Sequence, residues 1–146
     1  MGKKRIITNQ NANVSDNGGK TGVFKKGTVK KQLLKGIINI SSSYNNTIVS
    51  VSDLGGNVYV WSSAGTLGFK GARKSTPYAA TLVGKDAVEK GKRFGLQEAK
   101  ISITGIGPGR EGAIRGVAGT GVNIISIIDN TPIPHNGVKP AKPRRV

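Results

Sequence analysis

Every apolar run with a regular period lies between Gly36 and Asp129, so this central segment has to supply the folded core. Residues 1–35 mix Asn, Gly, Lys and Thr without any apolar period. After Asp129, four prolines in a short segment forbid a regular helix or strand. The 146-residue sequence therefore predicts one domain at residues 36–129, with an N-terminal extension at residues 1–35 and an extended tail at residues 130–146.

Basic residues dominate the charge and gather at the two ends of the chain. The sequence holds 23 Lys and Arg against 7 Asp and Glu, a net charge of +16. Residues 1–35 contain nine basic residues and one acid, Asp16, which gives a net charge of +8. Residues 36–129 contain ten basic and six acidic residues, a net charge of +4. Residues 130–146 contain four basic residues and no acid, which again gives +4. This balance predicts a polyanionic partner, most simply a nucleic acid. Because charges of one sign repel each other, we expect the extension to be disordered or ordered by RNA, and the Pro-rich basic tail to stay extended along RNA.

The residues on which enzymes and metal sites depend are missing or isolated. The chain has no cysteine, which excludes disulfides and thiolate metal sites. His135 is the single histidine, and no carboxylate lies near it in the tail to complete an acid–base or metal site. No apolar stretch approaches the ~18 residues that a membrane-spanning helix needs. The sequence therefore predicts that the protein is not an enzyme and binds no metal, cofactor, membrane or small-molecule substrate.

Short runs rich in β-branched residues predict five strands. Thr47–Asp53 alternates apolar and polar residues, and a Gly-rich turn joins it to Asn57–Ser63, which predicts a hairpin. Pairing Gly36–Tyr44 with this hairpin gives a three-stranded antiparallel meander. Ala99–Gly105 and Val122–Asp129 are the last two strands, and the density of β-branched residues in Val122–Asp129 predicts a central place in the sheet.

Two helices are expected between the last three strands. Ser75 or Thr76 can cap a helix over Pro77–Phe94, because proline is tolerated in the first turn, and Gly95 then ends it. A shorter helix is expected at Arg110–Ala118. The predicted buried face of the first helix contains Ala79, Leu82, Val83, Ala87 and Lys90.

The order of the elements, β-β-β-α-β-α-β, predicts the fold. Strands that are joined through helices run parallel, with right-handed crossovers. We therefore expect an α/β domain that consists of one mixed five-stranded sheet with two helices packed on it. Basic, extended segments are expected before and after this domain in the chain.

A glycine-rich loop before the second helix resembles a cofactor motif. Gly107, Gly109 and Gly112 form the pattern G-x-G-x-x-G, and Asp129 lies 20 residues after Gly109, near the position of the ribose-binding acid in dinucleotide-binding proteins. However, that motif normally sits on the first strand of a long βαβαβ run, whereas this one follows the fourth strand. Pro108 also removes an N–H group that could have faced a phosphate.

The loop therefore has three interpretations: a dinucleotide site, a tight turn without a ligand, or a contact with RNA phosphates. Free N–H groups at a helix N-terminus suit any phosphate, including a nucleic-acid backbone. Arg110 and Arg115 lie in the following helix, where both can meet an anionic chain. We favour the RNA contact because the composition already predicts a nucleic-acid partner.

Gly68–Thr76 is a second segment whose groups suit RNA. Lys70, Arg73 and Lys74 lie among glycines that allow a close approach of the backbone. Phe69 either stacks on a base or anchors the loop in the core. We expect the cations to contact RNA, although a solvated basic loop is the simpler alternative.

Two asparagines and the tail supply the remaining candidate RNA contacts. Asn45 and Asn46 either form a turn between two strands or bond phosphates, sugars or base edges. The tail combines stiffening prolines with basic residues, which predicts a segment that threads along RNA.

Four motifs, in this order along the chain, carry a resemblance to a known family. They are "NNTIVSVSD", "WSSAGTLGFKGARKSTPYAA", "GIGPGREGAIR" and "GVNIISIIDNTPIPHNGVKPAKPRRV", and the match runs from about Gly36 to Val146. In these motifs the chain resembles universal small-subunit ribosomal protein eleven in its bacterial-type form, of bacterial or organellar origin. The resemblance implies an α/β fold with a ribonuclease-H-like sheet arrangement and no catalysis.

The resemblance also implies a role and partners. The family is a structural constituent of the platform of the small ribosomal subunit, where it binds the central domain of the rRNA near the 3′ end and the mRNA exit path and supports translation. Its neighbours are the sixth, eighteenth and, in many bacteria, twenty-first small-subunit proteins. The chain would then lie on ribosomes of the bacterial cytoplasm, a mitochondrion or a plastid. Residues 1–35 match nothing in the family, so their partner stays open.

The residue arguments and the resemblance together predict rRNA contacts in four places: the asparagine turn, the basic glycine loop, the G-x-G loop with its helix, and the tail. The expected rRNA-binding residues are Asn45, Asn46, Phe69, Lys70, Arg73, Lys74, Ser75, Gly107, Gly109, Arg110, Arg115, His135, Asn136, Gly137, Lys139, Lys142, Arg144 and Arg145.

Overall fold

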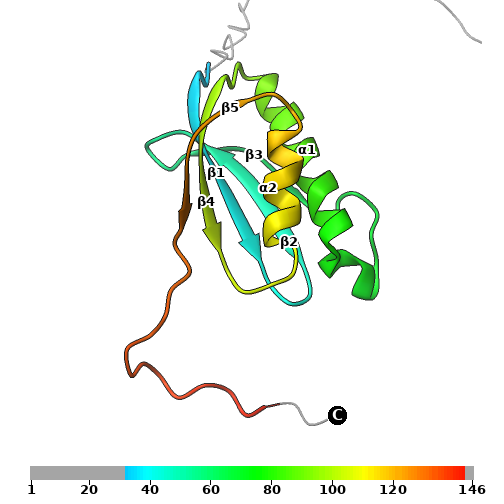
Figure 1. Cartoon of the computed structure of the whole chain (residues 1–146), viewed down its shortest axis with the longest axis vertical. Coiled ribbons are helices and arrows are strands. Elements are labelled where there is room, and N and C mark those ends of the chain that lie inside the picture. Colours follow the sequence, from blue (N-terminus) through cyan, green and yellow to red (C-terminus); the bar gives the residue numbers. More distant parts are fainter. Residues whose placement is uncertain (1–31, 144–146) are drawn as a thin grey trace, which may run out of the picture.

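The computed structural model describes residues 32–143. Most of the predicted N-terminal extension, and the predicted contacts at Arg144 and Arg145, lie outside the described residues. Along the chain the elements are β1 (Lys35–Ser42), β2 (Thr47–Ser52), β3 (Val58–Ser63), the 3-10 helix η1 (Gly71–Ser75), α1 (Pro77–Lys92), β4 (Glu98–Thr104), α2 (Arg110–Ala118) and β5 (Asn123–Asp129) (Figure 1).

The strands form one mixed sheet in the order β3-β2-β1-β4-β5, which confirms the predicted five-stranded α/β fold. β1, β2 and β3 are the expected antiparallel meander, with Val49 opposite both Ile40 and Ser62. β4 pairs in parallel with β1 and with β5, so Ile101 lies between Ile38 and Ile127. The chain therefore crosses from one edge of the meander to the other through α1, and adds β5 through α2.

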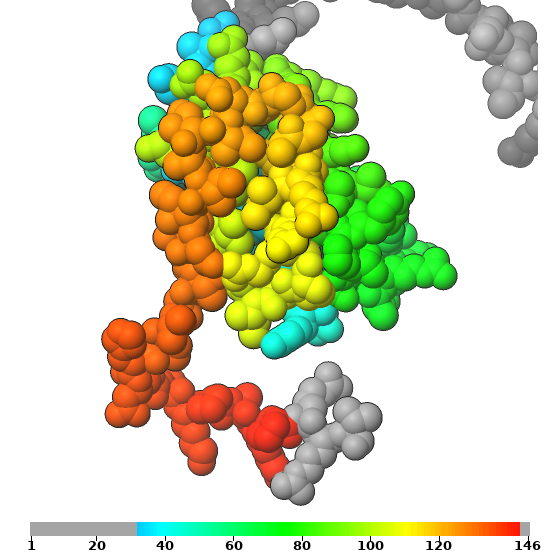
Figure 2. Space-filling view, in the orientation of Figure 1, coloured from blue at the N-terminus to red at the C-terminus, as the bar shows by residue number. Residues whose placement is uncertain are grey.

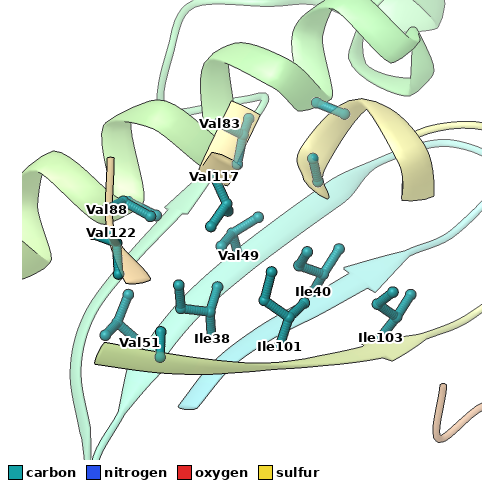
Figure 3. Close-up of a cluster of buried hydrophobic side chains, with 14 of the residues drawn as sticks. Ile38, Ile40, Val49, Val51, Val83, Val88, Ile101, Ile103, Val117 and Val122 are labelled. Carbon is teal, nitrogen blue, oxygen red and sulfur yellow. The ribbon is translucent and has the colours of Figure 1, made fainter. Parts of the chain in front are cut away.

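Both helices pack on one face of the sheet and enclose a core of aliphatic side chains. Figure 3 shows Val83 and Val88 of α1 and Val117 of α2 pointing toward isoleucines and valines of the central strands. The alternate residues of β1, Ile38 and Ile40, are completely buried. The period-two alternation of these strands thus directs one set of side chains into the core.

The structure corrects the prediction that the last strand is central, because β5 is an edge strand. Ile125, Ile127 and Ile128 are exposed there. α2 packs chiefly against α1 and not over β5, so Ile127, on the helix side like its partner Ile101, gains no cover, and Ile128 lies on the face without helices. Dense β-branched residues identify a strand, but they do not determine where it lies in the sheet.

The buried face of α1 is also rotated from the predicted one. Ala79, Val83 and Ala87 are buried as expected, but Leu82 and Lys90 are only half-buried. The prediction was wrong for these two positions because α2 packs along the side of α1 that carries its small residues. That side completes the buried face with Ala80, Gly84, Val88 and Gly91.

Close contact between α1 and α2 depends on glycines. A Cβ added to Gly112 would lie 2.3 Å from the carbonyl oxygen of Pro77, and one added to Gly116 would lie 2.2 Å from that of Thr81. Real Cβ contacts are never this short, and the obstructing atoms are backbone atoms that cannot turn aside. The two helices therefore approach backbone to backbone, which holds their first turns side by side.

We expect Gly112→Ala to lower the free energy of unfolding by roughly 1–3 kcal/mol, because the added methyl group would push the helices apart. Gly119→Ala is the matched control: Gly119 has a helical φ of −66° and ψ of −7°, and its nearest obstruction lies at 3.4 Å. Alanine there is expected to leave stability unchanged or to raise it by less than about 1 kcal/mol. Urea unfolding followed by circular dichroism compares the two, and equal stabilities would contradict the packing role of Gly112.

Candidate nucleic-acid interface

The predicted contact segments meet at one end of the sheet, which we call the loop end. It consists of the β1–β2 turn (residues 43–46), residues 64–76, the 105–109 loop and the start of the tail at residue 130. The N-termini of α1 and α2 and the last residues of β1, β4 and β5 all point to this end (Figure 1). Ligand sites of open α/β sheets commonly lie at the carboxyl ends of the parallel strands.

Backbone hydrogen bonds join these segments to one another. The Gly107 N–H donates to the carbonyl of Ser42 at 3.0 Å, which ties the 105–109 loop to the β1–β2 turn. The Asn130 N–H donates to the carbonyl of Ile103 at 2.8 Å, which fixes the first residue of the tail beside β4. Segments that are far apart in sequence therefore keep defined relative positions.

The two asparagines of the β1–β2 turn have different surroundings. Ser43 closes the turn, because its N–H donates to the Asn46 carbonyl at 2.9 Å and its hydroxyl accepts from the Asn46 N–H at 3.1 Å. Asn45 is exposed at the tip. The side-chain oxygen of Asn46 is buried without a hydrogen-bond partner among the described residues. The structure thus confirms that the pair forms a turn, while the contact of its amides with RNA stays a prediction.

Residues 70–76 present cations in front of α1. Lys70 and Arg73 are exposed and Lys74 is half-buried, all in or beside η1. The hydroxyl of Thr76 accepts the Ala79 N–H at 3.2 Å and is therefore the helix cap, while Ser75 donates to the Ala72 carbonyl. The short 3-10 turn thus fixes the positions of the cations against the helix start.

Phe69 anchors this basic segment. It packs against the hydrophobic core, and its ring meets Tyr78 edge to face with centroids 6.4 Å apart. Of the two roles considered for Phe69, these contacts favour the anchor over the base-stacking platform. Tyr78 is the more exposed of the two rings, and the sequence analysis did not single it out. No sequence signal marked it, because only the tertiary fold brings its ring to the loop end.

The glycines of the G-x-G-x-x-G motif serve packing. Gly107 and Gly109 are buried. A Cβ at Gly107 would lie 2.1 Å from the carbonyl oxygen of Ser43, and one at Gly109 would lie 2.2 Å from the hydroxyl of Thr47. The tight turn without a ligand is therefore sufficient to explain these glycines. The predicted RNA contact of Gly107 and Gly109 stays a prediction.

The guanidinium of Arg110 is held by the protein itself. It donates to the carbonyl of Gly105, to the hydroxyl of Thr131 at 3.1 Å and to the carboxylate of Asp129. Hydrogen bonds from the hydroxyl and the N–H of Thr131, and then from Arg110, hold the pKa of Asp129 below its ordinary value. Arg110 thus joins the 105–109 loop to the end of β5 and sets the direction in which the tail leaves the domain.

Arg115 lies on the outer side of α2 and remains exposed. Its guanidinium pairs with Glu111 at 3.1 Å, and 78% of its side chain is open to solvent. A pair this exposed contributes little to stability, so it does not prevent Arg115 from meeting an external anion.

The tail leaves the loop end as an exposed segment without a helix or strand (Figures 1 and 2). Asn136 has a φ of 58°, a conformation that turns the tail at its Asn-Gly pair. The predicted contact residues of the described part of the tail are all exposed: His135, Asn136, Gly137, Lys139 and Lys142.

Among the described residues, no group of three or more His, Cys, Asp or Glu could hold a metal ion. In the same part of the chain, none of the helices is long and apolar enough to cross a membrane.

Comparisons with known proteins agree with the motifs and the fold. The family model for ribosomal protein S11 matches residues 36–145. Small ribosomal subunit protein uS11 of Desulfotalea psychrophila is 52% identical over 124 residues, which cover 85% of this chain and 98% of that protein. Its counterpart in Aquifex aeolicus is 51% identical over 122 residues, which cover 84% of this chain and 98% of that protein.

These matches confirm the resemblance found in the sequence, and they exclude the dinucleotide enzyme as an interpretation of the glycine loop. The domain is a ribosomal protein and not an enzyme, and its loop end collects the motifs that the resemblance singled out. The chain belongs to the ribosomal protein S11 family.

Proposed function

We propose that the chain, as a structural constituent of the small ribosomal subunit, binds and organises the central domain of the small-subunit rRNA on the platform, near the rRNA 3′ end and the mRNA exit path. One observation carries this proposal. The asparagine turn, the basic segment at residues 70–76, the 105–109 loop and the tail, which are separate in sequence, converge at the loop end.

The charges at the loop end suit a folded polyanion. Lys70, Arg73 and Lys74 take part in none of the salt bridges among the described residues. Cations of this kind replace the counterions condensed on phosphates, which releases those ions and drives binding. The sheet and its helices hold these cations in fixed relative positions, so the protein favours one arrangement of RNA strands over others.

The two termini extend the contact surface. The tail is exposed and basic, and we infer that it orders along rRNA, where phosphates offset the repulsion between its charges. We assign the same role to residues 1–35, which carry the largest share of the net charge. The proposed protein neighbours are the sixth, eighteenth and twenty-first small-subunit proteins. The protein would act on the ribosome, in the bacterial cytoplasm or in an organelle.

The first test is the binding of the purified protein to the rRNA central domain and to an unrelated RNA of equal length, across a salt series. We expect tighter binding to the central domain, with a steep decrease of affinity as salt increases. Equal affinity for both RNAs would contradict a site-selective role. Co-sedimentation with small subunits separates a ribosomal protein from an RNA-binding regulator outside the ribosome.

Arg73→Gln should weaken binding to the central domain and reduce the slope of log affinity against log salt by about 1, because one phosphate contact is lost. Lys100→Gln is the matched control, since Lys100 is exposed on β4 and lies on the sheet face that the helices do not cover. It should leave affinity and slope close to those of the unmodified protein. Equal losses for the two variants would show that only overall charge matters and not the loop end.

Deleting residues 139–146 should weaken rRNA binding and flatten its salt dependence, because it removes Lys139, Lys142, Arg144 and Arg145. A tail of unchanged length with glutamine at these four positions should behave like the deletion. A filter-binding salt series compares the three proteins. An unchanged salt slope in both variants would contradict a tail that contacts phosphates.

A further inference from the structure

A groove opens between the first turns of α1 and α2, at the loop end. Its volume is about 440 Å³, within the range of clefts that hold small-molecule groups. Tyr78 and Thr81 of α1 form one side, and Pro108, Glu111 and Arg115 form the other. Figure 2 shows the two rims, green α1 and yellow α2, on the same face of the molecule. We call this feature the interhelix groove.

The groove owes its form to the glycine contacts between the helices. Gly107 and Gly112 lie along it and carry no side chain, so backbone lines this part of the wall. The contact of Gly112 with Pro77 holds the rims at a fixed separation. A cavity whose shape is set by backbone contacts is present before any ligand arrives, which lowers the cost of binding.

Tyr78 offers a fixed aromatic surface at one rim. Its side chain is 68% exposed, although its ring is steadied edge to face by Phe69, which packs against the core. An exposed ring whose orientation is already set loses little entropy when a flat partner stacks on it. Unpaired RNA bases are such partners, and proteins commonly bind them on aromatic side chains.

Arg115 offers a cation at the opposite rim. Arg110 also borders the groove, but the Gly105 carbonyl, Thr131 and Asp129 already accept from its guanidinium. Arg115 is mostly exposed, and among the described residues its guanidinium pairs only with the equally exposed Glu111. Because the Glu111 carboxylate repels phosphate, a phosphate is best placed on the outer side of Arg115, with the neutral base toward the groove.

We propose that the interhelix groove holds one unpaired nucleotide of RNA, with its base stacked on Tyr78 and its phosphate bonded by Arg115. This inference rests on the proposed function and adds a requirement to it. A base inside a duplex cannot enter such a groove, because its faces and pairing edge are already covered. The RNA at the loop end must therefore offer a bulged, looped or terminal nucleotide.

The test compares variants on two probes: the rRNA central domain, and a pair of RNA hairpins that differ by one bulged nucleotide. The unmodified protein should prefer the bulged hairpin by about tenfold, the size of one base–aromatic stacking contact. Tyr78→Ala should remove this preference and weaken binding to the central domain by a similar factor without changing the salt slope, because stacking releases no counterions. Tyr78→Phe keeps the ring and should keep both properties.

Arg115→Gln should instead reduce the salt slope by about 1, as expected for a lost phosphate contact. Trp61→Ala is the control, because Trp61 is also an exposed aromatic residue, at 56%, but lies on β3 away from the groove. It should bind both probes as the unmodified protein does. Thermal unfolding verifies that each variant is folded.

Three outcomes are informative. If Tyr78→Ala binds both probes like the unmodified protein, the nucleotide site is overturned while the rRNA-binding role stands. If Tyr78→Ala keeps its affinity for RNA but binds less to assembled small subunits, the groove holds a protein segment, and the nucleotide proposal is overturned. If the unmodified protein does not distinguish the central domain from unrelated RNA, the proposed function itself fails, and the hairpin pair still decides whether the groove takes an unpaired base.

Discussion

The loop end depends on one physical constraint, which is that the backbone from Gly107 to Gly116 must approach its neighbours more closely than any side chain would allow. The approach is to Ser43 of the β1–β2 turn at Gly107, to Thr47 at the start of β2 at Gly109, and to α1 at Gly112 and Gly116. It places both helix N-termini, the β1–β2 turn and the tail exit next to one another. The glycine motif therefore resembles a cofactor fingerprint for a simple reason, since both need close backbone contact where a strand turns into a helix.

Fixed geometry also determines what the charges can do. A chain of net charge +16 would bind any polyanion if its cations moved independently. Here the segment before α1 is held by the Thr76 cap and the Phe69 anchor, and the tail exit is held by Arg110 and Thr131. If the proposed function holds, selectivity for one RNA fold follows from such fixed positions, whereas the exposed tail adds affinity with little selectivity.

The sequence predicted the elements of the fold better than their arrangement. Period-two alternation located β2, and Thr76-Pro77 located the start of α1, because these features act within a few residues. The edge position of β5 could not be predicted, since it depends on the order in which the strands pair, and β5 pairs with β4 alone. For the candidate site, the structure shows that the predicted segments meet at the loop end, and their contact with RNA stays a prediction. Tyr78 was missed, because only the tertiary fold places its ring at the rim of a groove.

Arg110 shows why the net charge overstates the number of cations that are free to bind phosphate. Counterion release depends on cations that are free to meet phosphate, and within the domain several cations already face carboxylates: Lys35 with Glu98, Lys90 with Asp86, Arg110 with Asp129 and Arg115 with Glu111. Of these pairs, that of Arg115 is the most exposed, and both of its members line the interhelix groove. At the loop end, the positive charge that the proposed RNA site would use lies on the segment before α1 and on the outer side of α2. An RNA chain that touches both must pass across the N-termini of the two helices.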